Sequence, residues 1–179
     1  MTVHIQDSPA AAYRRAGEAH DLDALAATLS EDVVFHSPLS ATAEFRGKEQ
    51  ALELFSVVFG VLSDLRYHTD VGDDRTRALT STARLGGREI HEAAVAEFGE
   101  DGLIRDLTLW IRPLPALTAM MAALGPGLAR AAGRPAVSLL VAAAVKPLAA
   151  MTALGDRTLV PLVTRSRREG ARPKRGHRS

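Results

Sequence analysis

Three side chains that could move a proton or polarise a carbonyl group stand out in this sequence. Glu92 lies in an alternating run whose other residues on its own face are apolar, and burial among apolar groups raises a carboxyl pKa and makes the group a usable acid or base. His36 ends a short apolar strand, where a neutral imidazole could accept a proton. Tyr13 lies on the apolar stripe of a predicted helix. These residues predict acid-base chemistry beside an apolar interior.

Each of the three residues also has a structural interpretation. Strand alternation puts His36 on the side away from the apolar residues, where it would hold the end of the strand by a hydrogen bond. Glu92 could form a buried ion pair with Arg84 or Arg88. Tyr13 could be a core tyrosine whose hydroxyl is satisfied within the protein. The sequence leaves both interpretations open.

Two short helices are predicted at the start of the chain. Ser8-Pro9 is typical of a helix cap followed by proline at the first helical position. The helix after it buries the face that carries Tyr13. Asp21 is the predicted cap of a second helix, which is expected to end at Ser30.

A strand, a second short strand and a longer helix are expected next. The first strand covers residues 32–38, and the short strand and turn cover 44–47. The helix over 48–62 carries large apolar side chains on one side, namely Leu52, Phe55, Phe59 and Leu62. A helix of this kind is expected to cover a sheet or a pocket.

From Asp64 onward the hydrophobic period changes from 3.6 to 2. Four strands are predicted over 65–71, 77–85, 88–98 and 103–112, with glycine-containing turns between them. Gly86-Gly87 has the composition of a two-residue hairpin turn. Three hairpins in a row make an antiparallel meander, and with the preceding helices they indicate an α+β fold, a curved sheet packed against N-terminal helices.

Beyond Pro115 the composition shifts to Ala, Leu, Val and Met, which predicts a helical C-terminal extension over 116–155. Helices are expected over 116–124 and 136–154, with a break at Gly125-Pro126-Gly127. The second stretch is long enough for a membrane span, but Lys146-Pro147 lies at its middle, where a charge is costly. A helical lid or a partner-facing hairpin is the preferred interpretation, and a membrane partner is not expected.

The last part of the chain, 156–179, is predicted to be a basic, disordered tail after the 1–115 domain and the extension. From Arg165 onward the chain has seven Lys and Arg residues and one acidic residue, Glu169, so this segment carries a net charge of +6. Because the whole chain has a net charge of +1, the part before Arg165 carries −5. The tail lacks aromatic residues, so no specific nucleic-acid partner is expected. We predict that it is solvated.

Composition restricts the remaining classes. At 179 residues and 46% apolar content the chain suits one domain with an appendage. Without cysteine there is no disulfide framework, and the histidines show no metal-ligand spacing, so neither a metal nor another cofactor is predicted. The first fifteen residues lack the pattern of a signal peptide. We expect a cytoplasmic protein.

Several short motifs together resemble a known superfamily. Tyr13, Asp21-Leu22-Asp23, Phe35-His36-Ser37-Pro38 and Phe45-Arg46-Gly47 occur in the order seen in the nuclear transport factor 2-like superfamily, in the SnoaL-like branch that includes ketosteroid isomerase and polyketide cyclases. The resemblance covers about residues 10–115. It implies a cone in which a curved sheet surrounds a deep apolar pocket, and commonly a homodimer formed between sheets.

The resemblance carries over the catalytic residues of ketosteroid isomerase incompletely. The family's oxyanion-stabilising tyrosine falls on Tyr13, which matches. Its general base falls on Ser37 and its second acid on Ala94, and neither side chain can replace a carboxyl group. If this chain is an isomerase or cyclase, Glu92 or His36 must move the proton.

Two classes of function remain for a chain of this family. One is a cofactor-free isomerase or cyclase acting on a small apolar carbonyl compound; the other is a noncatalytic ligand-binding or dimerisation module. The residues expected to line the pocket are Phe35, Ser37, Phe55, Phe59, Ala94 and Leu109. The residues expected to form the homodimer face are Asp106, Thr108, Trp110 and Arg112, with the tryptophan as anchor.

Overall fold

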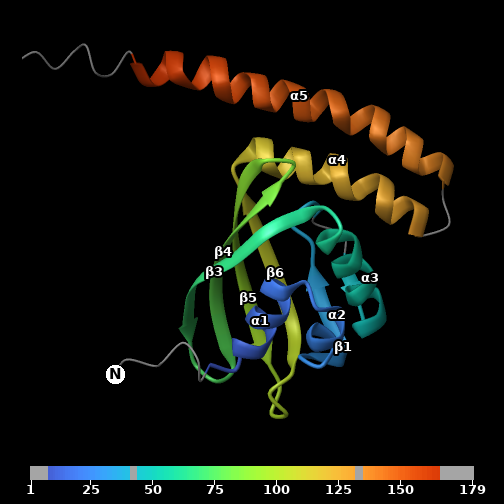
Figure 1. Ribbon diagram of the computed structural model, residues 1–179, viewed down its shortest axis with the longest axis vertical. Coiled ribbons are helices and arrows are strands. Elements are labelled where there is room, and N and C mark those ends of the chain that lie inside the picture. The colour runs from blue at the N-terminus through green and yellow to red at the C-terminus, as the bar shows by residue number, and fades with distance from the viewer. Residues whose placement is uncertain (1–7, 41–43, 132–134, 166–179) are drawn as a thin grey trace, which may run out of the picture.

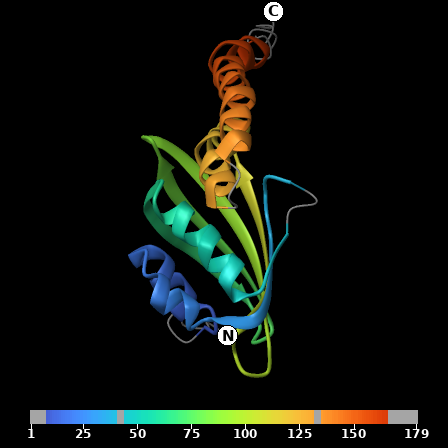
Figure 2. The ribbon, with the colours of Figure 1, turned by 90° about the vertical axis from the view of Figure 1, so that its right-hand side faces the viewer.

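A strongly curved, six-stranded sheet forms the body of the protein, and helices cover one of its faces (Figures 1 and 2). The structure is a computed structural model, and it describes residues 8–40, 44–131 and 135–165. The covering helices are α1 (Ala11–Ala19), α2 (Leu22–Ala26) and α3 (Lys48–Phe59). The predicted α+β class is confirmed, and the open, curved sheet is consistent with a cone.

The strands follow the predicted meander, and the first strand adds two pairings that the sequence did not indicate. They are β1 (Leu29–His36), β2 (Glu44–Arg46), β3 (Leu62–Gly72), β4 (Thr76–Leu85), β5 (Arg88–Phe98) and β6 (Ile104–Arg112), in the sheet order β2-β1-β6-β5-β4-β3. β3 to β6 pair antiparallel through the three predicted hairpins. β1 joins the sheet by pairing in parallel with β6, which places Phe35 beside Leu107.

The N-terminal helices begin and end slightly away from the predicted residues. Ser8 accepts a hydrogen bond from the amide of Ala10 through Oγ at 3.1 Å, so it stabilises the turn before α1 and does not cap the helix itself. The predicted cap of α2 is correct, because Asp21 Oδ1 accepts from the Ala24 amide at 2.9 Å. The predicted end at Ser30 is wrong: α2 ends at Ala26, and Ser30 already belongs to β1.

An irregularity in β3 reverses the faces that strict alternation predicts. The register against β4 shifts between Tyr67 and Thr69. As a result, Asp70 is buried and Val71 is 56% exposed, opposite to the expected pattern. A bulge has this effect because one extra residue moves every later side chain to the other face. The bulge therefore places a carboxyl group inside the fold.

The C-terminal extension is a hairpin of two long helices, α4 (Leu114–Ala131) and α5 (Pro135–Arg165), that lies across one end of the sheet (Figure 2). The predicted break at 125–127 is wrong, because α4 continues through Pro126. A β-carbon on Gly127 would lie 3.0 Å from Val57 Cγ1, so this glycine permits α4 to approach α3 closely. The glycine serves helix packing and does not end the helix.

The boundary of the basic tail also differs from the prediction. Residues 156–165 continue α5 and are helical, whereas the sequence placed them in a disordered tail. The rest of the predicted tail, 166–179, lies outside the described residues. Among the helices that the structure describes, none combines the length and the apolar character needed to cross a membrane.

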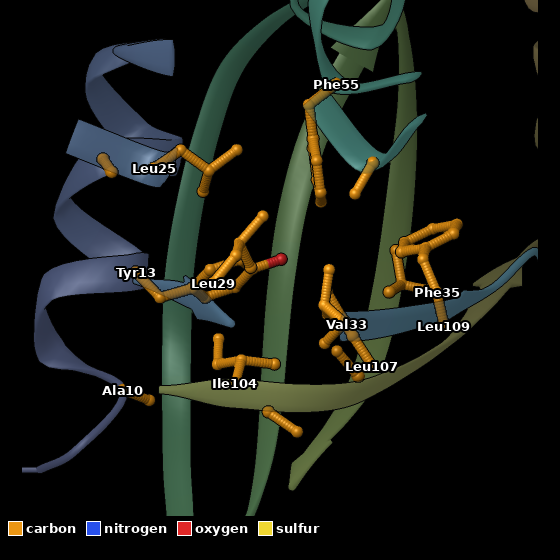
Figure 3. Packing of buried hydrophobic residues seen from close by; sticks show 14 of the residues in the cluster. Ala10, Tyr13, Leu25, Leu29, Val33, Phe35, Phe55, Ile104, Leu107 and Leu109 are labelled. Atoms are coloured by element: carbon orange, nitrogen blue, oxygen red, sulfur yellow. The ribbon is translucent and has the colours of Figure 1, made fainter. Parts of the chain in front are cut away.

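Buried apolar side chains form two clusters that meet inside the curve of the sheet. The first joins α1, α2 and α3 to β1 and β6, with Leu25, Val33 and Leu107 among its fully buried residues (Figure 3). The second joins α4 to β3, β4 and β5, and it includes Met120 of α4 and Ile90 of β5. The helical hairpin is therefore more than an appendage, because α4 forms part of the core.

The other face of the sheet carries the residues expected to form a homodimer. Trp110 is 54% exposed on this face, which is high for so large an apolar side chain. A single chain does not test association, so the homodimer stays a prediction.

Candidate functional site

An apolar cavity lies where the two core clusters meet. Its walls come from α1, α2, α3, the sheet and α4, and they are mostly aliphatic and aromatic. Five of the six residues expected to line a pocket do line this cavity, namely Phe35, Ser37, Phe55, Phe59 and Leu109. Ala94, the sixth, is buried in the first core cluster and is not among the lining residues.

The volume of the cavity is small. It measures about 60 Å³, which is space for about four to six water molecules on a scale where one needs roughly 10–15 Å³. Met120, Leu124 and Leu128 of α4 contribute to its wall. A ligand that contains a ring therefore requires lining side chains, such as the flexible Met120, to move.

Glu92 is the acidic side chain in the wall of this cavity. It lies on β5 and is partly buried, and its Oε1 accepts a hydrogen bond from Ser81 Oγ at 3.5 Å. Burial raises the pKa of Glu92 to about 7, although the Ser81 hydrogen bond lowers it slightly. Among the residues that the structure describes, neither Arg84 nor Arg88 pairs with it, since Arg84 donates to the Gly87 carbonyl oxygen. Glu92 can therefore hold or release a proton near neutral pH.

Two tyrosines face the same cavity as Glu92. The Tyr13 and Tyr67 rings meet edge to face with centroids 6.1 Å apart, and their hydroxyls share a hydrogen bond. Burial, together with the nearby negative charge of Glu92, raises the pKa of both phenols above their usual value. Both hydroxyls therefore stay protonated at neutral pH. Tyr67 uses its hydroxyl hydrogen in the bond to Tyr13, and Tyr13 keeps its own hydrogen to donate to another group. Figure 3 shows the Tyr13 hydroxyl pointing from α1 toward the strands.

The strand pairing explains why these groups converge. Tyr67 of β3 pairs with Ser81 of β4, Ser81 with Glu92 of β5, and Glu92 with Ile111 of β6. Paired residues in a sheet point to the same face, so this row brings Tyr67, Glu92 and Ile111 to the cavity wall, with Ser81 hydrogen bonded to Glu92 beside it. Tyr13 reaches this row from α1, where Gly17 lets Tyr67 pack close to the helix.

His36 is not part of this group. Its Nε2 lies 2.7 Å from Asp106 Oδ2 and its Nδ1 lies 3.6 Å from Glu44 Oε1. These partners belong to the opposite face of the sheet, and His36 is not among the lining residues of the cavity. Strand alternation separates His36 from Tyr13 and Glu92, and its observed role is to hold the end of β1.

Ser37 lines the cavity, but its hydroxyl has a structural partner. Its Oγ accepts a hydrogen bond from the Leu39 amide at 3.2 Å, which stabilises the turn after β1. This is the position at which the resemblance places the general base of ketosteroid isomerase. A hydroxyl in a turn does not replace that carboxylate, so Glu92 is the acidic group available to the cavity.

Two parts of the site were not anticipated. The alternation of Leu65 and Tyr67 in β3 indicates that Tyr67 points inward. An inward tyrosine on a strand near an inward glutamate was the signal that could have identified it. The α4 residues in the cavity wall had no such signal: a helical lid was one of the two interpretations of the extension, but which residues it places in the wall depends on how the extension folds back. Within the described residues, no group of His, Asp and Glu side chains is arranged to hold a metal ion.

The comparison with protein families decides where this chain belongs. A model of the SnoaL-like domain matches residues 10–107, which is more than half of the chain. The chain belongs to the SnoaL-like domain family. The match covers α1 to α3, β1 to β5 and the first part of β6, with most of the residues around the cavity. The rest of β6, α4 and α5 lie outside it, and with them the α4 part of the cavity wall.

Solved structures place the SnoaL-like domain within the nuclear transport factor 2-like fold. A steroid delta-isomerase from Pseudomonas aeruginosa is 28% identical, with a TM-score of 0.62, and the match covers 70% of this chain and 92% of that one. A conserved bacterial protein with a cystatin-like fold from Silicibacter pomeroyi DSS-3 is 24% identical, with a TM-score of 0.62 over 65% and 82% of the two chains.

A third structure supports the fold alone. A nuclear transport factor 2-like protein of unknown function from Cytophaga hutchinsonii is 15% identical, with a TM-score of 0.52 over 65% of this chain and 96% of that chain. A search among curated proteins finds no match. The suspected superfamily is thus confirmed at the level of family and fold.

Proposed function

We propose that this SnoaL-like protein is a cofactor-free isomerase or cyclase that acts on a small apolar carbonyl compound. The observation that carries the proposal is the Glu92 carboxyl, with a pKa of about 7, facing the hydroxyls of Tyr13 and Tyr67 in an apolar cavity. A base whose pKa lies near the working pH is suited to proton transfer. Neutral phenols nearby are suited to stabilise the negative charge that forms on oxygen.

In the proposed reaction, the Glu92 carboxylate removes a proton from the carbon next to the carbonyl group. The electron pair of the broken C–H bond moves to the carbonyl oxygen and forms an enolate, to which Tyr13 donates a hydrogen bond while Tyr67 donates to Tyr13. In an isomerisation, the protonated Glu92 returns the proton to a different carbon. In a cyclisation, the enolate carbon instead bonds to a second carbonyl carbon, whose oxygen takes the proton. Neither route needs a redox partner.

The similarity to the steroid delta-isomerase supports an isomerase, and the position of the carboxyl group sets this chain apart. The resemblance to ketosteroid isomerase places the general base just after β1, but this position holds Ser37. The candidate base, Glu92, lies instead on β5. A base on a different strand approaches a bound carbonyl compound from a different direction. We therefore expect a substrate preference of its own, within the class of apolar ketones.

The experiment that tests the proposal is a turnover assay on a panel of apolar ketones and aromatic polyketides. Glu92→Gln removes the base and is expected to lower the rate constant about 100-fold or more. Tyr13→Phe removes one oxyanion donor and is expected to lower it by about 100-fold. Glu97→Gln is the matched control, because this glutamate is exposed on the same strand. Unchanged turnover in both Glu92→Gln and Tyr13→Phe would remove the assignment.

The pH dependence of turnover gives an independent check on the role of Glu92. The base must be ionised, so the rate constant should rise with pH and level off above about 7, where the Glu92 carboxyl has lost its proton. A rate that is already constant from pH 5 upward contradicts an elevated pKa for the base.

The size of the cavity favours a second candidate function, a noncatalytic ligand-binding module. A volume of about 60 Å³ leaves little space for a substrate unless the α4 wall moves. Met120→Ala enlarges the cavity at that wall. If ligands stabilise the Met120→Ala protein in a thermal-shift screen and neither protein turns any of them over, the binding module is the better description.

A further inference from the structure

The helix α4 covers one side of the cavity with a row of apolar side chains. Met120, Leu124 and Leu128 follow one another every four residues, and all three line the cavity. Figure 1 shows the last turns of α4 above α3, and in both ribbon views α5 lies on the side of α4 away from the sheet. The cavity is therefore covered on this side by a helix that does not belong to the sheet or to the N-terminal helices.

The contact between α3 and α4, here called the seam, is close but thin. A β-carbon on Gly127 of α4 would lie 3.0 Å from Val57 Cγ1 of α3. Val58, Leu124 and Leu128 line the cavity beside this contact. Because Val58 and Leu128 are only partly buried, these two residues border both the cavity and the solvent. A single layer of aliphatic residues thus separates the cavity from the outside at the seam.

The other walls of the cavity are held by more directional contacts. Backbone hydrogen bonds join β3 to β6 into a continuous wall. Between α1 and α3, the rings of Tyr13 and Phe55 meet edge to face at 6.5 Å between centroids, and His20 stacks on Phe59 at 4.8 Å. Aliphatic contacts such as those at the seam are non-directional and can separate and form again without a defined geometry. Of these walls, the seam opens at the lowest cost.

The attachment of α4 to the sheet lies at the end of the helix that is far from the seam. The Pro113 carbonyl oxygen accepts hydrogen bonds from the amides of Ala116 and Leu117 at 2.9 and 3.1 Å, so α4 starts directly after β6. At about 1.5 Å per residue, Gly127 lies about 20 Å along the helix from Leu114. A rotation of about 15° around the attached end would therefore move Gly127 about 5 Å away from α3.

The pairing of α4 with α5 makes the hairpin one moving part. Thr118 Oγ1 of α4 lies 2.7 Å from Thr152 Oγ1 of α5, and in the described part of the chain α5 packs mainly on α4. At the base of the hairpin, a hollow of about 230 Å³ is lined by Arg157 of α5 and by Arg88 and Glu89 of β5. This hollow leaves space for the base of the hairpin to tilt.

We propose that the seam is the entrance of the cavity and that the α4–α5 hairpin is a lid, which turns away from α3 to admit an apolar compound with a ring and then closes over it. The lid explains why the closed cavity measures only about 60 Å³. It rests on the proposed function in one respect, that the cavity receives a ligand. Closure would also keep water away from Glu92, and burial is the main cause of the raised pKa of that group.

The test uses the lack of cysteine in this sequence. Val57→Cys with Gly127→Cys locks the seam, because the two positions are close enough for a disulfide. Thr118→Cys with Thr152→Cys is the matched lock, which ties α5 to α4 and leaves the seam free. Each oxidised protein also carries Leu109→Cys, which places one free thiol in the cavity wall. The rate at which methyl methanethiosulfonate labels this thiol measures how often the cavity opens.

The control thiol is Leu107→Cys, two residues earlier on the same strand. Leu107 is 1% exposed and is not among the lining residues of the cavity, so a thiol there reacts when the whole protein unfolds. Dividing the labelling rate at position 109 by the rate at position 107 removes differences in global stability between the two locked proteins. We expect this ratio to be about tenfold or more lower in the seam-locked protein than in the hairpin-locked protein.

A substitution that wedges the seam open gives the opposite sign. Gly127→Leu adds a side chain where a β-carbon already meets Val57, and in a chain that carries Leu109→Cys without either lock it should raise the labelling rate about tenfold. Circular dichroism and peptide mass mapping verify the fold and the disulfide pairing of every variant.

Two outcomes overturn the lid. One is an equal ratio in the two locked proteins, which means that the cavity opens elsewhere, such as past the turn at Ser37. The other is a hairpin-locked protein in which the thiol at position 109 reacts no faster than the thiol at position 107, because the cavity then opens only with global unfolding. Labelling does not involve turnover, so a failure of the lid is distinguishable from a failure of the proposed reaction.

Discussion

Asp70 and Glu92 both point to the helical side of the sheet, but their surroundings differ. Asp70 is fully buried between Arg77, whose Nε donates to Oδ1 at 2.7 Å, and Arg14, whose Nη1 donates to Oδ2 at 3.0 Å. Burial alone would raise the pKa of Asp70, yet hydrogen bonds from Ser8 and the two arginines hold it below its usual range. Asp70 is therefore ionised and structural.

Glu92 shows what burial does without a cation. The carboxyl receives one long hydrogen bond from Ser81, and burial raises its pKa to about 7. An inward carboxyl group lowers the stability of the fold when it is ionised. The ion pairs with Arg14 and Arg77 offset this cost for Asp70, and Glu92 has no such pair among the described residues. The comparison teaches that pairing, and not burial as such, decides whether the pKa of an inward acid is lowered or raised. Four measurements can break or sharpen this contrast.

The largest effect is expected from Asp70→Asn. The substitution leaves Arg77, whose side chain is 4% exposed, buried without its counter-charge, which should lower the free energy of unfolding by about 3–5 kcal/mol. Because the pKa of Asp70 is lowered on folding, wild type keeps this contribution at neutral pH and loses it in acid, below the usual value of 3.8. Denaturant unfolding at several pH values measures both effects.

The matched control for Asp70→Asn is Asp74→Asn, in the exposed turn between β3 and β4. This change should alter the free energy of unfolding by about 0.5 kcal/mol or less. Equal losses in the two variants would mean that the buried ion pair does not hold this end of the sheet together.

The next largest effect is expected from Glu92→Gln, and it has the opposite sign. The folded-state pKa is raised from 4.5 to about 7, so the wild-type protein loses stability as pH rises through this interval, when the buried group ionises. The variant has no such loss and should be more stable than wild type at pH 8, by up to about 3 kcal/mol. At pH 4 the two proteins should be alike. A variant that is less stable at both pH values contradicts the unpaired state of Glu92.

A smaller effect is expected at the tyrosine pair. Tyr67→Phe removes the hydroxyl that is hydrogen bonded to Tyr13 and should cost about 1 kcal/mol of unfolding free energy. Combined with Tyr13→Phe in a double-mutant cycle, the two changes should be non-additive by about 0.5 kcal/mol or more, because they share one interaction. Strict additivity would show that the two hydroxyls do not interact.

The sequence predicted the orientation of Glu92 better than that of Asp70. Glu92 lies in a regular strand, so the period of two correctly indicated that it points inward with Ile90 and Ala94. Asp70 was placed on the wrong face because the bulge in β3 reverses the alternation after Tyr67. A signal did exist: Arg77 belongs to the inward set of β4, and a buried arginine requires an acid on a neighbouring strand.

The helical extension was the least predictable part of the fold. Pro126 and Gly127 indicate a break by their local preferences, but packing of α4 against α3 outweighs those preferences. The contribution of Met120 to the cavity wall follows from that packing, and a local pattern cannot reveal it. His36 could be excluded from the cavity by alternation alone, which put it on the outer face with Asp106.

The most direct test of the account is an NMR titration of the Glu92 side-chain carboxyl in the full chain, assigned by comparison with Glu92→Gln. The account predicts a midpoint near pH 7, because the group is buried beside Tyr13 and Tyr67, and no cation in the described part of the chain stabilises its charge. A midpoint near the ordinary value of 4.5 would contradict it, since the carboxyl would then be either hydrated or paired.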